Sequence, residues 1–239
     1  MPQHIVSAFE EELKTLDSMI AQMGGLAEQS LGRAIDALER RDPALAEEVI
    51  RSDEMIDRLE REVEELAVSI IARRQPMALD LRQIITVIRV AGDLERIGDL
   101  SKNIAKRAMA IAGEQRPNNL MIGLRHIGHT ALEQLKHVLD AYSQRDAEKA
   151  LKVWGNDEPI DRLYNSLFRE LLTYMMEDPR NIGLCTHLLF GAKNIERIGD
   201  HATNIAEMVH FMVTGKSITE RRPKSDTTNF AMPEANGAS

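Results

Sequence analysis

The chain of 239 residues has few aromatic side chains, a single cysteine and no long uninterrupted apolar run. Aromatic residues make up only 4% of the chain, although apolar residues together make up 43%. Sheets favour aromatic and β-branched residues, so a composition rich in alanine, leucine and glutamate predicts helices. No window reaches the roughly 18 apolar residues that span a bilayer, so we expect no membrane helix.

Other absences exclude several classes of protein. The lone Cys185 cannot form a disulfide within the chain and lies in an apolar helical pattern, which favours a buried, inert thiol. The first residues show no basic stretch followed by an apolar one, so we expect a soluble, cytoplasmic protein. The net charge of −8 argues against a nucleic-acid partner, because phosphate binding requires a basic face.

Familiar enzyme signatures are missing as well. The chain contains no P-loop, no G-x-S-x-G, no C-x-x-C and no His-Asp doublet. A di-iron bundle needs Glu-x-x-His on two helices, and only Glu207 and His210 have that spacing.

The sequence does contain a seventeen-residue segment that occurs twice, 101 positions apart. Residues 91–107 read AGDLERIGDLSKNIAKR and residues 192–208 read AKNIERIGDHATNIAEM, with nine identical positions. A second match, at a shift of 104, relates residues 53–59 to residues 157–163 and keeps six of seven positions. Each copy of an internal repeat forms the same structural unit, so we expect two equivalent units.

Apolar residues recur at three- and four-residue spacing through six segments, which indicates helices with one buried face. The expected helices cover residues 9–38, 43–74, 80–113, 120–143, 146–175 and 181–213. The fold class is therefore all-α, with two tandem three-helix bundles related by internal duplication. We place the first bundle at residues 1–114, a linker at 115–119, the second bundle at 120–214 and a flexible polar tail at 215–239.

Acidic residues of the first unit fall level with one another when its last two helices are folded back. If the chain reverses about residue 76, Asp57 lies level with Glu95 and Asp53 lies level with Asp99. Four carboxylates should therefore gather at the edge of this helix pair.

The second unit repeats this arrangement. Its hairpin reverses at the turn containing Pro179, which sets Asp161 level with Glu196 and Asp157 level with Asp200. One further turn along each helix, Asn103 and Asn204 would add a neutral oxygen to their groups.

Two interpretations of these groups stay open on geometry alone. Four converging carboxylates repel one another unless positive charge offsets them. The first interpretation is a surface lattice of ion pairs with arginines, whose members would be Arg58, Arg96, Arg162 and Arg197. The second is a pair of metal sites with hard oxygen ligands, suited to Mg, Mn, Fe or Ca.

Three neighbouring features have simpler structural explanations. Gly98 and Gly199 lie in the middle of helices, where glycine is unfavourable, and we interpret them as points of close helix crossing. His201 is interpreted as a solvated or partner-facing histidine. Trp154 either fills a bulkier core or is exposed for a partner.

The two Glu-Arg-Ile-Gly-Asp runs, each followed by Asn-Ile-Ala, closely resemble the PhoU family. The resemblance extends to residues 75–78 (QPMA), 80–82 (DLR) and 174–179 (YMMEDP), and it covers about residues 5 to 215. It implies two tandem three-helix bundles, often dimeric, that hold metal clusters on E/D-x-x-x-D motifs. The expected ions are divalent or iron-type, namely Fe, Mn, Mg or Zn. Carried onto this chain, the motifs comprise Asp53 with Asp57, Glu95 with Asp99, Asp157 with Asp161 and Glu196 with Asp200.

The resemblance also implies a role without catalysis. PhoU-like proteins repress the phosphate-starvation response by coupling the Pst phosphate transporter, through its ATPase and membrane subunits, to the PhoR sensor histidine kinase. The implied location is cytoplasmic, and peripheral to the inner membrane only through partners. One departure is Asp93, whose counterpart is Asn194, so the two sites could differ in charge or metal.

Two competing functions are kept beside this one. Carboxylates that hold two ions could activate water, which would make the chain a metal-dependent phosphate-ester hydrolase. Alternatively the chain is a purely structural helical module whose acids form ion pairs.

Overall fold

The computed structural model describes residues 2–114, 118–156 and 158–220. The first repeat contains α1 (Pro2–Arg40), α2 (Pro43–Arg74) and α3 (Leu79–Ala110). The second contains α4 (Asn118–Gln144), α5 (Ala147–Gly155), α6 (Glu158–Glu177), the short 3-10 helix η1 (Pro179–Asn181) and α7 (Ile182–Thr214). The described residues include no strand, as the composition predicts.

The helices form where apolar spacing and capping residues favour them. In α1 the side chains of Leu16, Ile20, Met23 and Ala27 are fully buried, which confirms the four-three pattern. Asp42 caps α2 by accepting hydrogen bonds from the backbone N–H groups of Ala44 and Leu45, and Pro43 follows in the first turn. Asp146 caps α5 in the same way, at the equivalent position of the second repeat.

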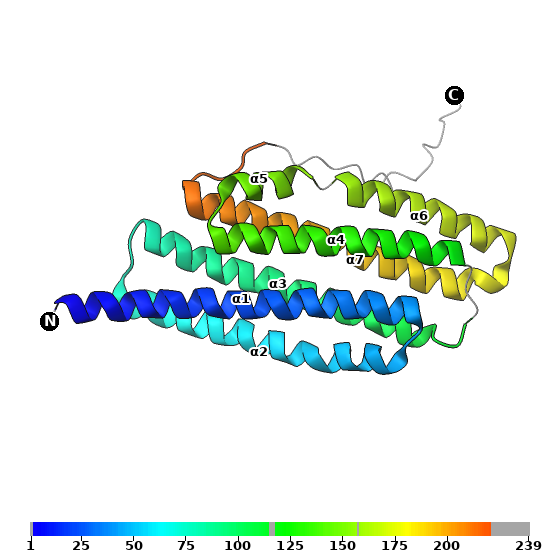
Figure 1. Cartoon of the computed structure of the whole chain (residues 1–239), viewed down its shortest axis with the longest axis horizontal. Coiled ribbons are helices and arrows are strands. Elements are labelled where there is room, and N and C mark those ends of the chain that lie inside the picture. The colour runs from blue at the N-terminus through cyan, green and yellow to red at the C-terminus, as the bar shows by residue number, and fades with distance from the viewer. Residues whose placement is uncertain (1, 115–117, 157, 221–239) are drawn as a thin grey trace, which may run out of the picture.

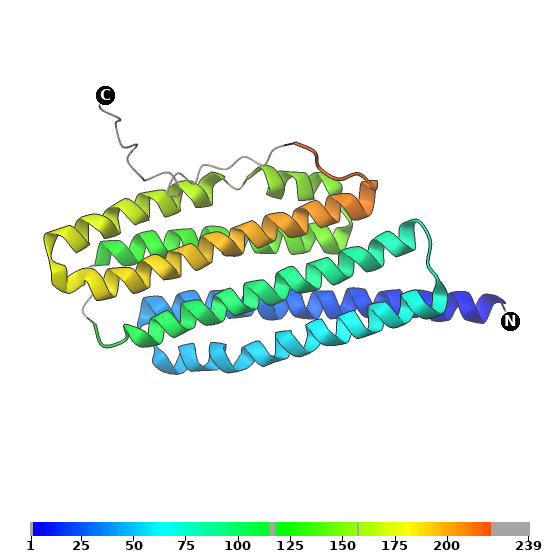
Figure 2. The same cartoon turned by 180° about the vertical axis from the view of Figure 1, so that it is seen from behind.

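Each repeat is a bundle. The two bundles lie side by side, and the helices of both run along the long axis of the molecule (Figure 1). The view from behind shows α3 and α7 next to each other where the bundles meet (Figure 2). Both helices bury residues on several faces, because each packs against its own repeat and against the other. The two Glu-Arg-Ile-Gly-Asp runs therefore lie at the centre of the molecule.

The prediction of one continuous helix over residues 146–175 is wrong. The structure ends α5 at Gly155, with Asn156 leaving the helical region, and begins α6 at Glu158. Pro159 has no N–H to continue a helix from α5, whereas the first repeat has Met55 at this place and keeps α2 intact. Asp157 lies outside the described residues, as do residues 115–117 of the expected linker and 221–239 of the expected tail.

A cluster centred on Asp17 of α1 joins the two repeats. Its carboxylate accepts hydrogen bonds from Gln83 Nε2 of α3 at 3.0 Å and from the Tyr142 hydroxyl of α4 at 2.9 Å. Arg145, in the turn between α4 and α5, donates from Nη2 to Asp17 Oδ2 at 3.1 Å. Two donors from the second repeat thus fix its position against α1.

Trp154 and Cys185 are both buried, so the structure supports the core interpretation of each. The indole N–H of Trp154 donates to Glu207 Oε1 at 2.9 Å. Across the described ranges, no helix combines the length and the apolar character that crossing a bilayer requires.

Candidate metal centres

The α2–α3 hairpin places the four predicted acids of the first repeat close enough to influence one another. Asp53 is 2% exposed, and burial raises the pKa of its carboxyl group, an effect reinforced by the negative charges of Asp57 and Asp99. The level pairing expected from reversal about residue 76 therefore gathers these side chains.

Lys102 provides the charge that offsets this repulsion. Its ammonium group forms a short ion pair with Asp53 Oδ2 and lies 3.6 Å from Asp99 Oδ1. The hydrogen bond to Asp53 raises the pKa of Lys102. Lys102 was absent from the predicted site, although its position three residues after Asp99 placed it on the same helix face.

Glu95 of α3 belongs to the same group, with its side chain 15% exposed. Burial raises its pKa to about 7, and nearby Asp99, Glu60 and Asp57 add to the rise, while Arg96 opposes it. Arg96 lies 3.4 Å from Glu95 Oε2 and 3.8 Å from Asp99 Oδ2. The guanidinium is well exposed, so water screens much of its effect.

Gly98 allows α2 and α3 to approach at this point, as its mid-helix position predicts. A Cβ atom there would lie 2.9 Å from Ile56 Cδ1 and 3.2 Å from Asp53 Oδ1. The absent side chain is therefore what lets the Asp53 carboxylate reach the helix interface.

The second group contains two deeply buried acids. Asp161 and Glu196 are 2% and 4% exposed, and Asp200 is half-buried. Lys193 Nζ lies 2.9 Å from Glu196 Oε2 and 4.9 Å from the centre of the Tyr164 ring. Lysines thus neutralise acids in both groups, although their sequence positions differ.

The four arginines of the predicted lattice have different surroundings. Arg96 contacts the first group, but Arg162 pairs with Glu158 at 2.9 Å, and Arg58 and Arg197 are exposed. The arginine pattern alone did not identify the lysines that carry out this role.

Asn103 is half-buried, whereas Asn204 faces the first repeat. The Asn204 amide donates to Asp93 Oδ1 at 3.3 Å, and His201 Nδ1 lies 2.8 Å from the same oxygen. The interpretation of His201 as solvated or partner-facing is therefore wrong, because the packing of α7 on α3 turns it toward Asp93. The structure places Asn204 at the junction of the repeats.

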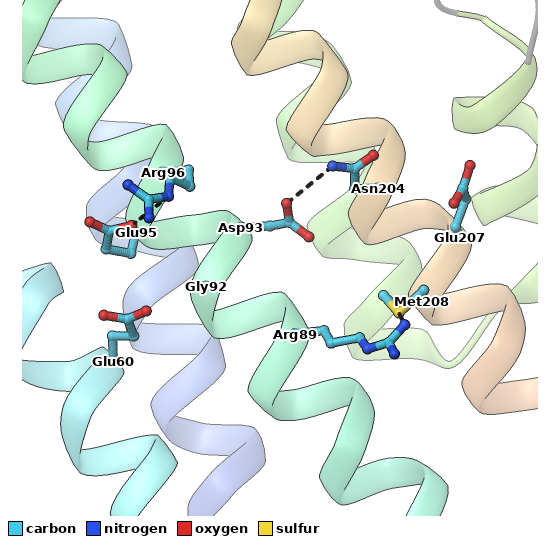
Figure 3. Close-up of a pocket in the computed structure, with 9 residues that line it drawn as sticks. All are labelled: Glu60, Arg89, Gly92, Asp93, Glu95, Arg96, Asn204, Glu207 and Met208. Atoms are coloured by element: carbon cyan, nitrogen blue, oxygen red, sulfur yellow. Dashed lines mark hydrogen bonds and ion pairs between the residues drawn. The ribbon is translucent and has the colours of Figure 1, made fainter.

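A pocket of about 390 Å³ lies at this junction, between α2, α3 and α7 (Figure 3). Glu60 and Glu95 line one side of it, and Asn204, Glu207 and Met208 line the other. Burial and the nearby Glu64 raise the pKa of Glu60. Glu60 was not among the predicted residues, although it lies on α2 one turn beyond Asp57.

The carboxylate oxygens of the first group are the kind of ligand that a hard metal ion prefers. Asp53 Oδ1 is buried and has no hydrogen-bond partner among the described residues, and burial opposes ionisation of both Asp53 and Glu95. A cation would supply the missing partner for oxygens of this kind. No three His, Cys, Asp or Glu side chains in the described part of the chain are already arranged as metal ligands.

Comparison with known proteins places these features in one family. The model of the PhoU domain matches the chain twice, at residues 20–108 and 124–209. A Rhizobium meliloti (strain 1021) protein named "Phosphate-specific transport system accessory protein PhoU homolog" is 58% identical over 226 residues, covering 95% of each chain. A protein of the same name from Caulobacter vibrioides (strain NA1000 / CB15N) is 48% identical, covering 95% of this chain and 98% of its own.

Solved structures agree with the sequence relatives. The crystal structure of PhoU from Pseudomonas aeruginosa superposes with a TM-score of 0.84 at 42% identity, covering 87% of this chain and all of that one. The phosphate transport system regulatory protein PhoU from Streptococcus pneumoniae gives a TM-score of 0.81 at 29% identity, with 88% and 99% covered. With both repeats matched in sequence and in fold, this chain belongs to the PhoU family.

Proposed function

We propose that this protein represses the phosphate-starvation response when phosphate is plentiful and modulates phosphate uptake, without catalysis of its own. It acts as an adaptor between the Pst transporter, through the ATPase subunit, and a PhoR-type sensor kinase. The names of its relatives support the link to phosphate-specific transport. It works as a homodimer in the cytoplasm and contacts the membrane only through these partners.

Two metal sites belong to this proposal. One site, on α2 and α3, would be held by Asp53, Asp57, Glu95, Asp99 and Asn103. The other would be held by Asp161, Glu196 and Asp200 of α6 and α7, by Asn204, which would have to leave Asp93, and by Asp157, which lies outside the described residues. The observation that carries the proposal is the burial of Asp53, Asp161 and Glu196, three motif acids from both repeats, at helix interfaces. A bound Fe, Mn, Mg or Zn ion would supply positive charge there, and Lys102 would have to leave Asp53.

Elemental analysis tests the metal sites. Protein purified without chelator should contain metal, and the double variant Glu95→Ala/Glu196→Ala should lose most of it, because each repeat loses one proposed ligand. The matched control is Glu54→Ala/Glu158→Ala, which removes exposed acids at equivalent positions beside the motifs. Equal metal content in all three proteins would contradict the assignment.

Regulation is tested in the cell. Deleting the gene should raise alkaline phosphatase activity in phosphate-rich medium, because repression is lost, and the intact chain should restore it. An unchanged activity in the deletion strain would refute the regulatory role. Size-exclusion chromatography with light scattering tests the homodimer, and co-purification with the Pst ATPase subunit and with the kinase tests the adaptor role.

The pocket beside Glu95 keeps phosphate-ester hydrolysis as the alternative, because a buried carboxyl group next to a cavity could serve a bound water. We expect no turnover on a panel of phosphate monoesters and diesters with Mg, Mn or Fe added. Turnover that disappears in Glu95→Gln would favour the hydrolase instead.

A further inference from the structure

A groove of about 740 Å³ lies between α4 and α5 of the second repeat, away from the predicted metal sites. Its walls carry His137 and Asp140 from α4, and Lys149 and Lys152 from α5. It extends to Gly155 and Asn156, where α5 ends, so the helix break of the second repeat opens one end of it. Its volume is within the range of sites that hold small ligands or peptide segments.

The first repeat has an exposed ion pair at the equivalent positions. There Arg33 of α1 and Glu48 of α2 face each other across the helix pair, with Arg33 Nη1 and Glu48 Oε2 3.5 Å apart. At the repeat shift of 104, these positions become His137 and Lys152. The second repeat therefore has two basic side chains where the first has an arginine and a glutamate. Neither of these two positions carries a carboxylate in the second repeat.

The acids that line the groove, Glu133 and Asp140, do not form an ion pair with His137 or Lys152 in the described structure. Lys149, nearer the hairpin turn, forms a short hydrogen bond with Gln144 Oε1. His137 and Lys152 are both exposed and available to an acid from outside the chain.

Gln134 gives a second, independent indication of a ligand. This side chain is 6% exposed and lines the groove, and its Nε2 donates to Thr203 Oγ1 at 3.3 Å. Its Oε1 is buried without a hydrogen-bond partner among the described residues. Leaving a buried acceptor unpaired is costly, so a donor that enters the groove would be stabilised there.

We propose that the α4–α5 groove binds an acidic segment of a partner protein. A glutamate or aspartate of the segment lies between His137 and Lys152, and a backbone N–H of the same segment donates to Gln134 Oε1. A peptide supplies both groups a few ångströms apart and can follow the groove of about 740 Å³, whereas inorganic phosphate, although its O–H groups can also donate, would fill only a small part of it. This inference does not depend on metal binding or on the identity of the kinase and transporter.

The probe is a displayed library of random twelve-residue peptides, selected on the full-length chain and counter-selected on Lys152→Glu. Selected peptides should share an acidic residue, and a fluorescein-labelled copy should bind the unmodified chain in an anisotropy titration. Binding should weaken at least tenfold in Lys152→Glu and when the acid of the peptide becomes its amide. Gln134→Leu should weaken it by about threefold to tenfold.

Two further variants separate lost binding from lost folding. His137→Arg/Lys152→Glu rebuilds the ion pair of the first repeat, so it should abolish peptide binding while its melting temperature is unchanged or higher. Glu48→Lys makes the matching change in the first repeat and should leave the affinity within about twofold. Selection of peptides without a shared acid, or an affinity unchanged in Lys152→Glu, would overturn the proposal. So would displacement of the peptide by millimolar inorganic phosphate, which would make the groove a simple anion site.

Discussion

Single residues decide the electrostatics of the candidate sites, and Glu95 is the clearest case. Its carboxyl group is held beside three other acids at a helix interface, and Arg96, largely exposed, offsets them incompletely. The raised pKa means that the folded state holds a proton on Glu95 at pH values where the unfolded chain has lost it.

This gives a pH-dependent prediction for metal-free protein. The folded pKa of about 7 lies above the ordinary value of 4.5, so Glu95 lowers stability progressively as pH rises through this window. Glu95→Gln, which cannot ionise, should be more stable than the unmodified chain at pH 8 by on the order of 1–2 kcal/mol, and similar to it at pH 5. Urea unfolding at both pH values measures this. The control variant Glu54→Gln, at an exposed position, should change the free energy of unfolding equally at both pH values. If Glu95→Gln also changed it equally at both pH values, the prediction would be contradicted.

In the first repeat the sequence indicated which acids come near enough to influence one another, but it did not predict which bases lie beside them. Asp53 and Glu95 could be placed because a short turn between two helices fixes their level. Lys102 and Lys193 could not be singled out, because a flexible side chain among many charged neighbours gives no periodic signal. His201 was misassigned because its partner, Asp93, belongs to the other repeat.

At the scale of elements, glycine controls how closely α2 and α3 approach. Gly98→Ala adds a Cβ within 2.9 Å of Ile56 and 3.2 Å of Asp53, both buried, and should destabilise the fold by about 1–3 kcal/mol despite the higher helix propensity of alanine. Gly92→Ala on the same helix is the matched control. Its Cβ would meet only Glu60 Oε1 at 3.9 Å, so it should stabilise by about 0.5–1 kcal/mol. Chemical denaturation measures the free energy of unfolding of the two variants. Equal changes in both would show that the distance between α2 and α3 at Gly98 does not limit stability.

The order and approximate positions of the helical segments were predictable from apolar spacing, whereas the interruption that divides one of them into α5 and α6 was not. The periodic pattern runs on from α5 into α6, so it indicated a single helix. Gly155, Asn156 and Pro159 were the local signals for a break, and the unbroken α2 of the first repeat made them easy to discount.

At the scale of the whole molecule, we expect the two bundles to unfold together, because Asp17 and the α3–α7 contact join them. Trp154, the only tryptophan, reports on the second repeat, and circular dichroism at 222 nm reports on both. The two signals should give one coincident urea transition. Tyr142→Phe should lower stability by about 1 kcal/mol, more than the exposed Arg145→Met. Separate transitions in the unmodified chain would show that the repeats are independent.

The contact of Asp93 with His201 and Asn204 affects which repeats can pack against each other. Two first repeats from different molecules, packed in the same way, would set Asp93 against Leu100 and Asn103. Two second repeats would set Asn194 against His201 and Asn204. Only the unlike pairing matches an acid with a histidine, so divergence at these positions favours the packing of a first repeat on a second repeat over the packing of two like repeats from different molecules.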